Sequence, residues 1–365
     1  MSTHRNRVKM TVSGTPGTGT ITLGSAVSGY QSAATAYGGN ATIDILVEEG
    51  TAWEVARDCT YTNSGTTVTR GTLEASSTGS AVSFTSAAVV SEILTATKGT
   101  YSETALKGLI PGGRLTLESG VPVSTTDQSA KTTIYYTPFV HNIISLWDGA
   151  NWVPTEFTET SLALGTITSA KPYDVFAYLS GGVLTLELLA WTSDLVRATA
   201  VTIQDGRYCK SGDKTRLLLG SFYTTSTTTT ADTARQRLVG NVYNTVIRGM
   251  FYASGAASHS YASATRRYWN NTSVSRLEAM LPIGGAFDSG TTSDLTGSNP
   301  RSELCLNDIS VVGYLVITKN GTSGTQLTAS GSTPAPAGFN FLGANEVGAA
   351  GGTYDYLTLT GSVAI

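Results

Sequence analysis

The chain has 365 residues, of which 40% are hydrophobic and only 13% charged, and its formal net charge is −3. Soluble proteins carry about 25% charged residues, and nucleic-acid-binding domains are strongly basic, so this balance argues against a nucleic-acid partner. No apolar run approaches the roughly 20 residues that span a bilayer, which argues against membrane insertion. The basic start of the chain is not followed by the apolar stretch of a signal peptide.

Small and hydroxylated residues point to the fold class. The chain has 40 glycines and is rich in Thr, which is β-branched and favours pleated, half-exposed surface. Glycine supplies the tight turns between strands. This composition predicts an all-β protein of three consecutive domains, each a β-sandwich or barrel. The predicted domains are residues 1–97, 114–249 and 250–365, with a Gly-rich linker at residues 98–113.

The first domain opens with the Gly-rich segment Gly14–Thr20. This segment lacks the Lys of a phosphate-binding loop, and a strand rather than a helix follows it, so we predict a turn. Strands spaced about 8–12 residues apart are typical of a sandwich or barrel. The predicted strands are Thr20–Leu23, Ala41–Glu48, Ala52–Val55, Thr66–Thr69, Ala81–Thr85 and Val89–Leu94.

The second domain carries three hairpin patterns. In the first, Asp148-Gly149 separates two apolar stretches, a combination that is typical of tight β-turns. Residues 231–244 have modest helical character with Thr230 as an N-cap, so the domain is expected to end in a short helix. The predicted hairpin strands are Ile143–Trp147 with Trp152–Phe157, Val175–Leu179 with Val183–Trp191, and Thr199–Ile203 with the segment after Gly206; Arg216–Thr225 follows as a further strand.

The third domain is expected to be a compact sandwich, with a jelly roll as one arrangement of its strands. Asn320-Gly321 predicts a hairpin turn after Val311–Thr318. The Pro-rich segment Ser332–Ala337 predicts a loop. Three strands are predicted, at Ser275–Met280, Leu304–Ile317 and Tyr354–Val363.

Long stretches of the first two domains resemble modules of tailed-bacteriophage structural proteins. VKMTVSGTPGTGTITLGSAVSGYQS, EEGTAWEVARDCTYTNSGTTVTR and LEASSTGSAVSFTSAAVV look like an N-terminal module of fibre and other virion proteins. RLTLESGVPV, ISLWDGANWV, AWTSDLVRATAVTIQDG and RLVGNVYN are similar to a second structural module of phage particles. The third domain resembles no family in the same way.

The resemblance implies a virion structural protein, assembled in the bacterial cytoplasm. We expect a fibre or spike that attaches to the particle by its N-terminal domain and presents its C-terminal domain to the host surface. The implied partners are further copies of the chain in a homotrimer, proteins of the head, neck or tail, and a host glycan or protein. Two alternatives remain, a head or collar decoration protein without a receptor and a polysaccharide-degrading tailspike. The first two interpretations predict no enzymatic activity.

Residues that carry chemistry are few and scattered. His4, His141 and His259 lie far apart and match no metal or triad pattern. Glu48 and Glu49 would point to opposite faces of a strand, so they cannot act as the carboxylate pair of a glycosidase. We therefore predict no catalytic residue, no metal and no cofactor. Three cysteines without CxxC spacing are expected to be buried free thiols: Cys59, Cys209 and Cys305.

Three groups of side chains are candidate contact sites. A basic and aromatic cluster in the third domain is either buried in a subunit interface or touches a host glycan or protein, since Arg and aromatic residues are enriched at interfaces. A cationic N-terminal arm is either a solvated tail or docks on an acidic virion partner. Trp147 and Trp152 form a cross-strand pair or a core anchor, or else a platform for a sugar. The cluster comprises Tyr261, Arg266, Arg267, Tyr268 and Trp269, and the arm comprises Arg5, Arg7 and Lys9.

Overall fold

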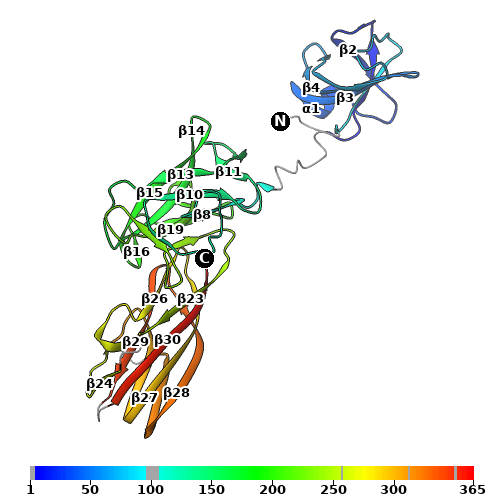
Figure 1. Ribbon diagram of the computed structural model, residues 1–365. Coiled ribbons are helices and arrows are strands. Elements are labelled where there is room, and N and C mark those ends of the chain that lie inside the picture. The colour runs from blue at the N-terminus through cyan, green and yellow to red at the C-terminus, as the bar shows by residue number, and fades with distance from the viewer. Residues whose placement is uncertain (1–4, 96–106, 256–257, 311–312, 349–351) are drawn as a thin grey trace. The chain divides into compact units, whose positions relative to one another are not determined.

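The chain folds into two compact units, Met1–Ser102 and Glu103–Ile365 (Figure 1). Nearly all of its regular elements are strands, so the all-β prediction is confirmed. No helix among the described residues is long and apolar enough to cross a membrane. The computed structural model describes residues 5–95, 107–255, 258–310, 313–348 and 352–365.

The first unit is a closed barrel. Six strands follow one another in the order β3-β7-β1-β2-β5-β4, and β4 returns to pair with β3. Alternate residues point inward, so Ile21, Ile45 and Val68 are fully buried in its core. The strands are β1 (Lys9–Ser13), β2 (Ile21–Ala26), β3 (Ala41–Glu49), β4 (Ala52–Thr62), β5 (Thr67–Thr69), β7 (Val89–Glu92) and, attached to β4, β6 (Thr72–Ser76).

Two features of the barrel differ from the sequence-based expectation. A short helix, α1 (Ala33–Tyr37), begins after Ser32, whose side chain accepts a hydrogen bond from the Thr35 amide. The predicted strand at 81–85 is wrong, because only Phe84 forms an isolated bridge there. A side chain provides a hydrogen-bond partner for the backbone of this segment instead: the Val82 amide donates to the buried carboxylate of Glu54.

The second unit begins with a lobe, residues 107–246, that we call the middle lobe. Its three predicted hairpins are confirmed. Their paired strands are β11 (Ile143–Trp147) with β12 (Trp152–Glu156), β14 (Pro172–Ser180) with β15 (Val183–Ser193), and β17 (Val201–Gln204) with β18 (Arg207–Lys210). One sheet has the order β16-β15-β14-β19-β18-β17, and β8, β10 and β13 form another. The further strands are β8 (Gly113–Thr116), β10 (Thr133–Pro138), β13 (Thr160–Ala163), β16 (Val196–Arg197) and β19 (Asp213–Tyr223).

The predicted helix at the end of this lobe is wrong, because residues 231–244 form short strands. The Thr230 hydroxyl donates to the Tyr223 carbonyl instead of capping a helix. A Cβ on Gly240 would lie 2.2 Å from the Met280 carbonyl, so two backbones meet closely here. Pairing with remote strands therefore outweighs a weak local helix preference. The strands are β20 (Thr230–Asp232), β21 (Gln236–Arg237) and β22 (Val239–Asn241).

The remainder of the second unit, residues 247–365, is the C-terminal lobe. Its strand β27 is paired along one side by β28 and along the other side first by β30 and then by β29 (Figure 1). β28 has β27 as its only strand partner among the described residues, so its outer edge is open. The strands are β23 (Ile247–Ala253), β24 (His259–Tyr261), β25 (Arg267–Tyr268), β26 (Arg276–Leu281), β27 (Gly285–Leu306), β28 (Leu315–Ala335), β29 (Gly338–Val347) and β30 (Gly352–Ala364).

Three local predictions for this lobe are wrong. The expected strand 304–317 is interrupted by the turn between β27 and β28, where Asn307 has a φ of +59°. Asn320 and Gly321 lie inside β28, opposite Ser298 and Gly297, and make no hairpin turn. The expected loop at 332–337 is strand up to residue 335.

The two lobes share a hydrophobic cluster and several hydrogen bonds. The Tyr223 and Phe339 rings stack with centroids 3.8 Å apart, and the Phe339 amide donates to the Asp194 carbonyl at 2.9 Å. The predicted boundary after residue 249 falls inside β23, and β9 (Gln128–Lys131), β20 and β21 extend the sheet of the C-terminal lobe. The cluster contains Trp191, Ala231, Leu238, Met280 and Phe339. Residues 103–365 therefore form one compact unit.

Candidate functional site

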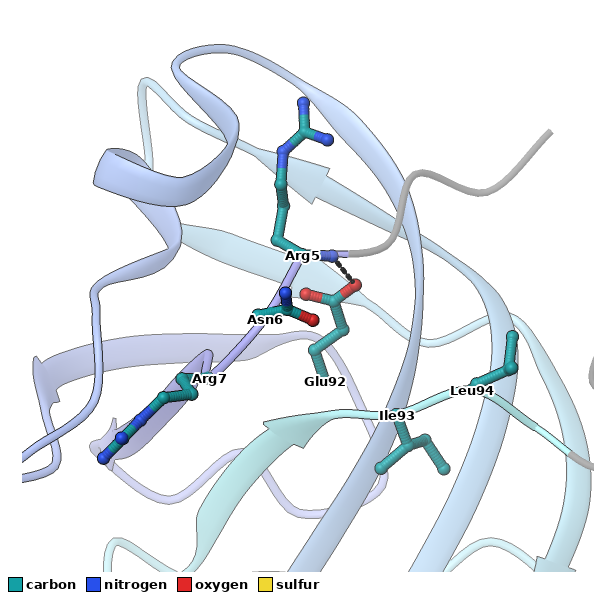
Figure 2. A pocket seen from close by; sticks show the side chains of 6 residues that line it. All are labelled: Arg5, Asn6, Arg7, Glu92, Ile93 and Leu94. Atoms are coloured by element: carbon teal, nitrogen blue, oxygen red, sulfur yellow. Dashed lines mark hydrogen bonds between the residues drawn. The ribbon is translucent and has the colours of Figure 1, made fainter.

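The described part of the N-terminal arm lies against the barrel of the first unit. The Arg5 amide donates to the Glu92 carboxylate at 2.5 Å, as Figure 2 shows. The Arg5 Nε donates to the Ala36 carbonyl at 3.0 Å. Lys9 already belongs to β1 and pairs with Glu48 at 3.7 Å. Residues 5–9 are therefore part of the fold, so the interpretation of this stretch as a solvated tail is wrong.

Arg7 is held by a second set of contacts. It has a φ of +60°, and its guanidinium donates to the Gly29 carbonyl at 2.6 Å and lies 5.5 Å from the Tyr30 ring centroid. The side chains of Arg5 and Arg7 are nevertheless exposed. They present two positive charges from a fixed backbone, which suits contact with an acidic surface.

Two shallow cavities flank these arginines. The first has a volume of ≈ 440 Å³, and the second, on the side of Tyr30, has a volume of ≈ 510 Å³. Leu94 at the rim of the first is 59% exposed, so the surface combines cations with an apolar side chain. The residues that line the first cavity are Arg5, Asn6, Arg7, Glu92, Ile93 and Leu94 (Figure 2).

The basic and aromatic cluster of the C-terminal lobe is built around two buried carboxylates. Arg266 donates to Glu303 through Nε at 2.7 Å and through a terminal nitrogen at 3.2 Å. Arg267 donates through Nε to Glu346 at 2.6 Å. Both glutamates are 0% exposed. The two arginines are therefore bound to acids of their own lobe.

The two carboxylates lie on opposite faces of one sheet. Glu303 is opposite Asn345 in the pairing of β27 with β29, whereas Glu346 is opposite Ser302. Neighbouring residues of a strand point to opposite faces, so Glu303 and Glu346 do not face each other. The same alternation lets the consecutive arginines reach one acid each.

Glu303 is held in its charged form. Burial disfavours its ionisation, but hydrogen bonds from Arg266, Asn345 and the Gly313 amide outweigh this effect and lower its pKa. The Arg266 guanidinium faces this fixed carboxylate, and a charge-assisted hydrogen bond of this kind is strong in a buried site. The arrangement stabilises the lobe.

Glu346 is surrounded by aromatic rings. It is hydrogen-bonded to His259 Nε2, and the His259 ring stacks on Tyr354 with centroids 5.4 Å apart. Trp269 meets Tyr354 edge-on at 5.3 Å and is only 1% exposed. Trp269 is therefore a core residue, and its prediction as a surface contact is wrong. Tyr261 and Tyr268 are half-buried, and Arg267 lies 3.9 Å from the Tyr261 ring centroid.

A second aromatic group lies at the end of the β11–β12 hairpin. Trp147 and Trp152 are direct cross-strand neighbours, and their rings meet edge-to-face with centroids 5.6 Å apart. Lys214 Nζ lies 4.5 Å from the Trp147 centroid, and the Arg207 guanidinium lies 4.5 Å from the Trp152 centroid. The predicted cross-strand pair is confirmed, and cations fix both rings in place.

A surface cavity of ≈ 430 Å³ adjoins this aromatic pair. Its walls come from the hairpin turn, from the β14–β15 turn and from the start of β19. Arg216 on the last of these is paired with Glu187 and lies 3.8 Å from the Tyr178 ring. The lining residues are Trp147, Asp148, Leu179, Gly182, Thr215 and Arg216.

Sequence reasoning missed the two buried glutamates of the C-terminal lobe. A signal for Glu303 was present, because it precedes the apolar run Leu304–Leu306, and a carboxylate within an apolar strand needs a partner. Within the described ranges, no group of three or more His, Cys, Asp and Glu side chains could hold a metal ion. The prediction of buried free thiols is confirmed for Cys59, Cys209 and Cys305.

No family model and no curated protein matches the chain. It is similar in part to the crystal structure of dimeric latent PorU from Porphyromonas gingivalis, with 12% identity, coverage of 55% of this chain and 24% of that chain, and a TM-score of 0.24. The insecticidal delta-endotoxin Cry8Ea1 from Bacillus thuringiensis is 9% identical, with coverage of 69% of this chain and 52% of that chain and a TM-score of 0.20. The structure of the infectious bursal disease virus Gx strain is 12% identical, with coverage of 66% of this chain and 65% of that chain and a TM-score of 0.22. The chain thus spans about a quarter of PorU and about half of Cry8Ea1, and likeness at these TM-scores assigns no function.

Proposed function

We propose that the chain is a structural protein of a tailed-phage particle, a short fibre or spike that the first unit attaches to the virion. The resemblance of stretches of the first two predicted domains to phage modules supports this proposal. The arginines predicted as contacts in the C-terminal lobe are bound to buried glutamates, as expected of side chains that support a fold.

The observation that carries the assembly part of the proposal is the open edge of β28. This strand has 21 residues and pairs only with β27 among the described residues. A long unpaired edge offers its backbone groups to another chain, and soluble monomers normally shield such edges. We propose that further copies of the chain, in a trimer, cover it.

A second candidate is a head or collar decoration protein that contacts no receptor. One observation favours it: the predicted host-contact cluster has its tryptophan in the core and its two arginines bound to acids. In that case any host contact would lie elsewhere on the chain. The two candidates share the attachment to the particle and differ in host binding.

Purified particles test the proposal directly. We expect mass spectrometry to find the chain in particles purified by density gradient, and antibodies to label one defined structure in electron micrographs. Absence from such particles would reject the virion role. Binding of the purified chain to host cells then separates a fibre from a decoration protein.

The docking surface is tested with particles assembled without the chain. Charge reversal at Arg5 and Arg7 should abolish reattachment of the purified protein. Reattachment of the unaltered protein should weaken as the salt concentration rises, because exposed charges are screened. The matched control is Arg57→Glu, a reversal in the same barrel at a residue paired with Asp58 and Glu74. Equal reattachment of the arm variant and the control would show that the arm is not the docking surface.

A further inference from the structure

The cavity beside Trp147 has the features of a saccharide site. Its volume of ≈ 430 Å³ lies in the range of small-molecule sites, about 300–1,000 Å³. It joins one aromatic ring, an aliphatic side chain and two charged groups, Asp148 and Arg216. We propose that this cavity binds one unit of a neutral carbohydrate, with the sugar's C–H face against the Trp147 indole. The proposal rests on this geometry and does not depend on the virion role.

The aromatic wall is held in place before any ligand arrives. The Trp152 Nε1–H donates to Asp205 Oδ2 at 3.0 Å, and Lys214 Nζ donates to the same oxygen at 2.8 Å. Lys214 in turn lies over the Trp147 ring, which packs edge-to-face with Trp152. A ring fixed in this way loses little conformational freedom when a ligand stacks on it, so more of the contact energy appears as affinity.

Asp148 supplies the polar partner. Its Oδ1 accepts the amide hydrogens of Ala150 and Asn151 at 2.8 and 2.7 Å, which closes the hairpin turn. These hydrogen bonds lower the pKa of Asp148, so it is a carboxylate at neutral pH. Because both turn contacts use Oδ1, Oδ2 is left to accept hydrogen bonds from ligand hydroxyls.

The charges around the cavity select an uncharged ligand. Asp148 repels anions, and the positive charge of Arg216 is already compensated by Glu187. A cation at the Trp147 indole would be repelled by Lys214, whose ammonium lies 4.5 Å from the ring centroid. A purely apolar ligand would cover the Asp148 carboxylate without giving it a hydrogen bond, which is costly. A neutral polyol with one apolar face satisfies all of these groups.

Saturation-transfer NMR on the full chain tests the site with D-glucose, D-galactose and a neutral dextran oligosaccharide as probes. We expect saturable binding of at least one of them, with a Kd of about 1–10 mM for a single sugar unit. Trp147→Ala should weaken binding at least tenfold. Asp148→Asn keeps the turn, since an amide oxygen still accepts both backbone hydrogens, and should weaken binding several-fold. Trp147→Phe should retain part of the affinity.

The control variant is Trp53→Ala, which removes a tryptophan that is 38% exposed in the first unit and should leave binding unchanged. Three results would each overturn the proposal. The first is the absence of saturable binding for every neutral probe. The second is unchanged binding by the Trp147→Ala variant, together with unchanged binding by a folded Asp148→Asn or Trp147→Phe variant. The third is tighter binding of D-glucuronate than of the neutral sugars. If the Trp147 and Asp148 variants lose sugar binding but still attach to the phage particle, the sugar site is independent of the virion role.

Discussion

The Arg266 guanidinium meets the Glu303 carboxylate with two nitrogens, at 2.7 and 3.2 Å, and the carboxylate is completely buried. The two residues are 37 positions apart: Arg266 lies directly before β25, and Glu303 lies on β27. Such a pair stabilises a lobe mainly because removing either partner takes the main counter-ion away from the other.

Removing the cation should therefore destabilise the C-terminal lobe. We expect Arg266→Ala to lower the free energy of unfolding by about 3 kcal/mol, because the buried carboxylate loses the cation that binds it with two nitrogens. Arg301→Ala is the matched control, since Arg301 reaches the same carboxylate only at 3.9 Å and its side chain is 38% exposed; its cost should stay below about 1 kcal/mol. Urea titration of both variants measures the difference. Equal losses would contradict the special role of Arg266.

The same pair predicts a dependence on pH. The pKa of Glu303 is lower in the folded than in the unfolded chain, so its stabilisation is complete above the unfolded pKa of about 4.3 and is lost as the pH falls through the folded pKa. Protonated Glu303 no longer needs Arg266. The difference in melting temperature between the wild type and Arg266→Ala should therefore shrink as the pH falls below about 4.3, and a constant difference there would show that the ion pair is not its cause.

The contact between the lobes predicts a second loss of stability. Phe339 is 6% exposed and stacks on Tyr223, so Phe339→Ala should cost about 3–4 kcal/mol, as for other buried Phe residues. Limited proteolysis should then separate the middle and C-terminal lobes. Phe251→Ala, at a side chain that is 50% exposed on β23, should change stability by less than about 0.5 kcal/mol. A cost for Phe251 as large as that for Phe339 would argue against the contact.

The cysteines should be unreactive in the folded chain. Burial raises the pKa of Cys59 and Cys209 to about 11 and that of Cys305 to about 12. Thiolates are the reactive form, so at pH 8 Ellman's reagent should titrate almost no thiol in the native protein and all three after unfolding in guanidinium. Rapid reaction of a native thiol would mean that one of them is accessible.

Local patterns were enough to predict the hairpins of the middle lobe. Asp148 closes its turn through its own side chain, so the pairing of Trp147 with Trp152 follows from adjacent residues. The helix prediction for residues 231–244 was wrong because the strands of this segment are specified by distant partners. β21 pairs with β26 and β22 with β19, and no local pattern contains that information.

The candidate sites show the same division. The aromatic pair was predicted, because both rings lie on one hairpin. The ion pairs of Arg266 and Arg267 join residues 37 and 79 positions apart, so the sequence revealed the cations but neither of their partners. Trp269 was misplaced for a related reason: an aromatic residue beside two arginines has the composition of an interface, while its burial depends on Tyr354 and His259.

Along the edge opposite β28, strand β27 pairs first with β30 and then with β29. Neither neighbour can detach without exposing amides of a backbone that the other still holds. The two halves of the C-terminal lobe should for this reason open together, and amide hydrogen exchange along β27 should report one shared opening free energy rather than a gradient from end to end.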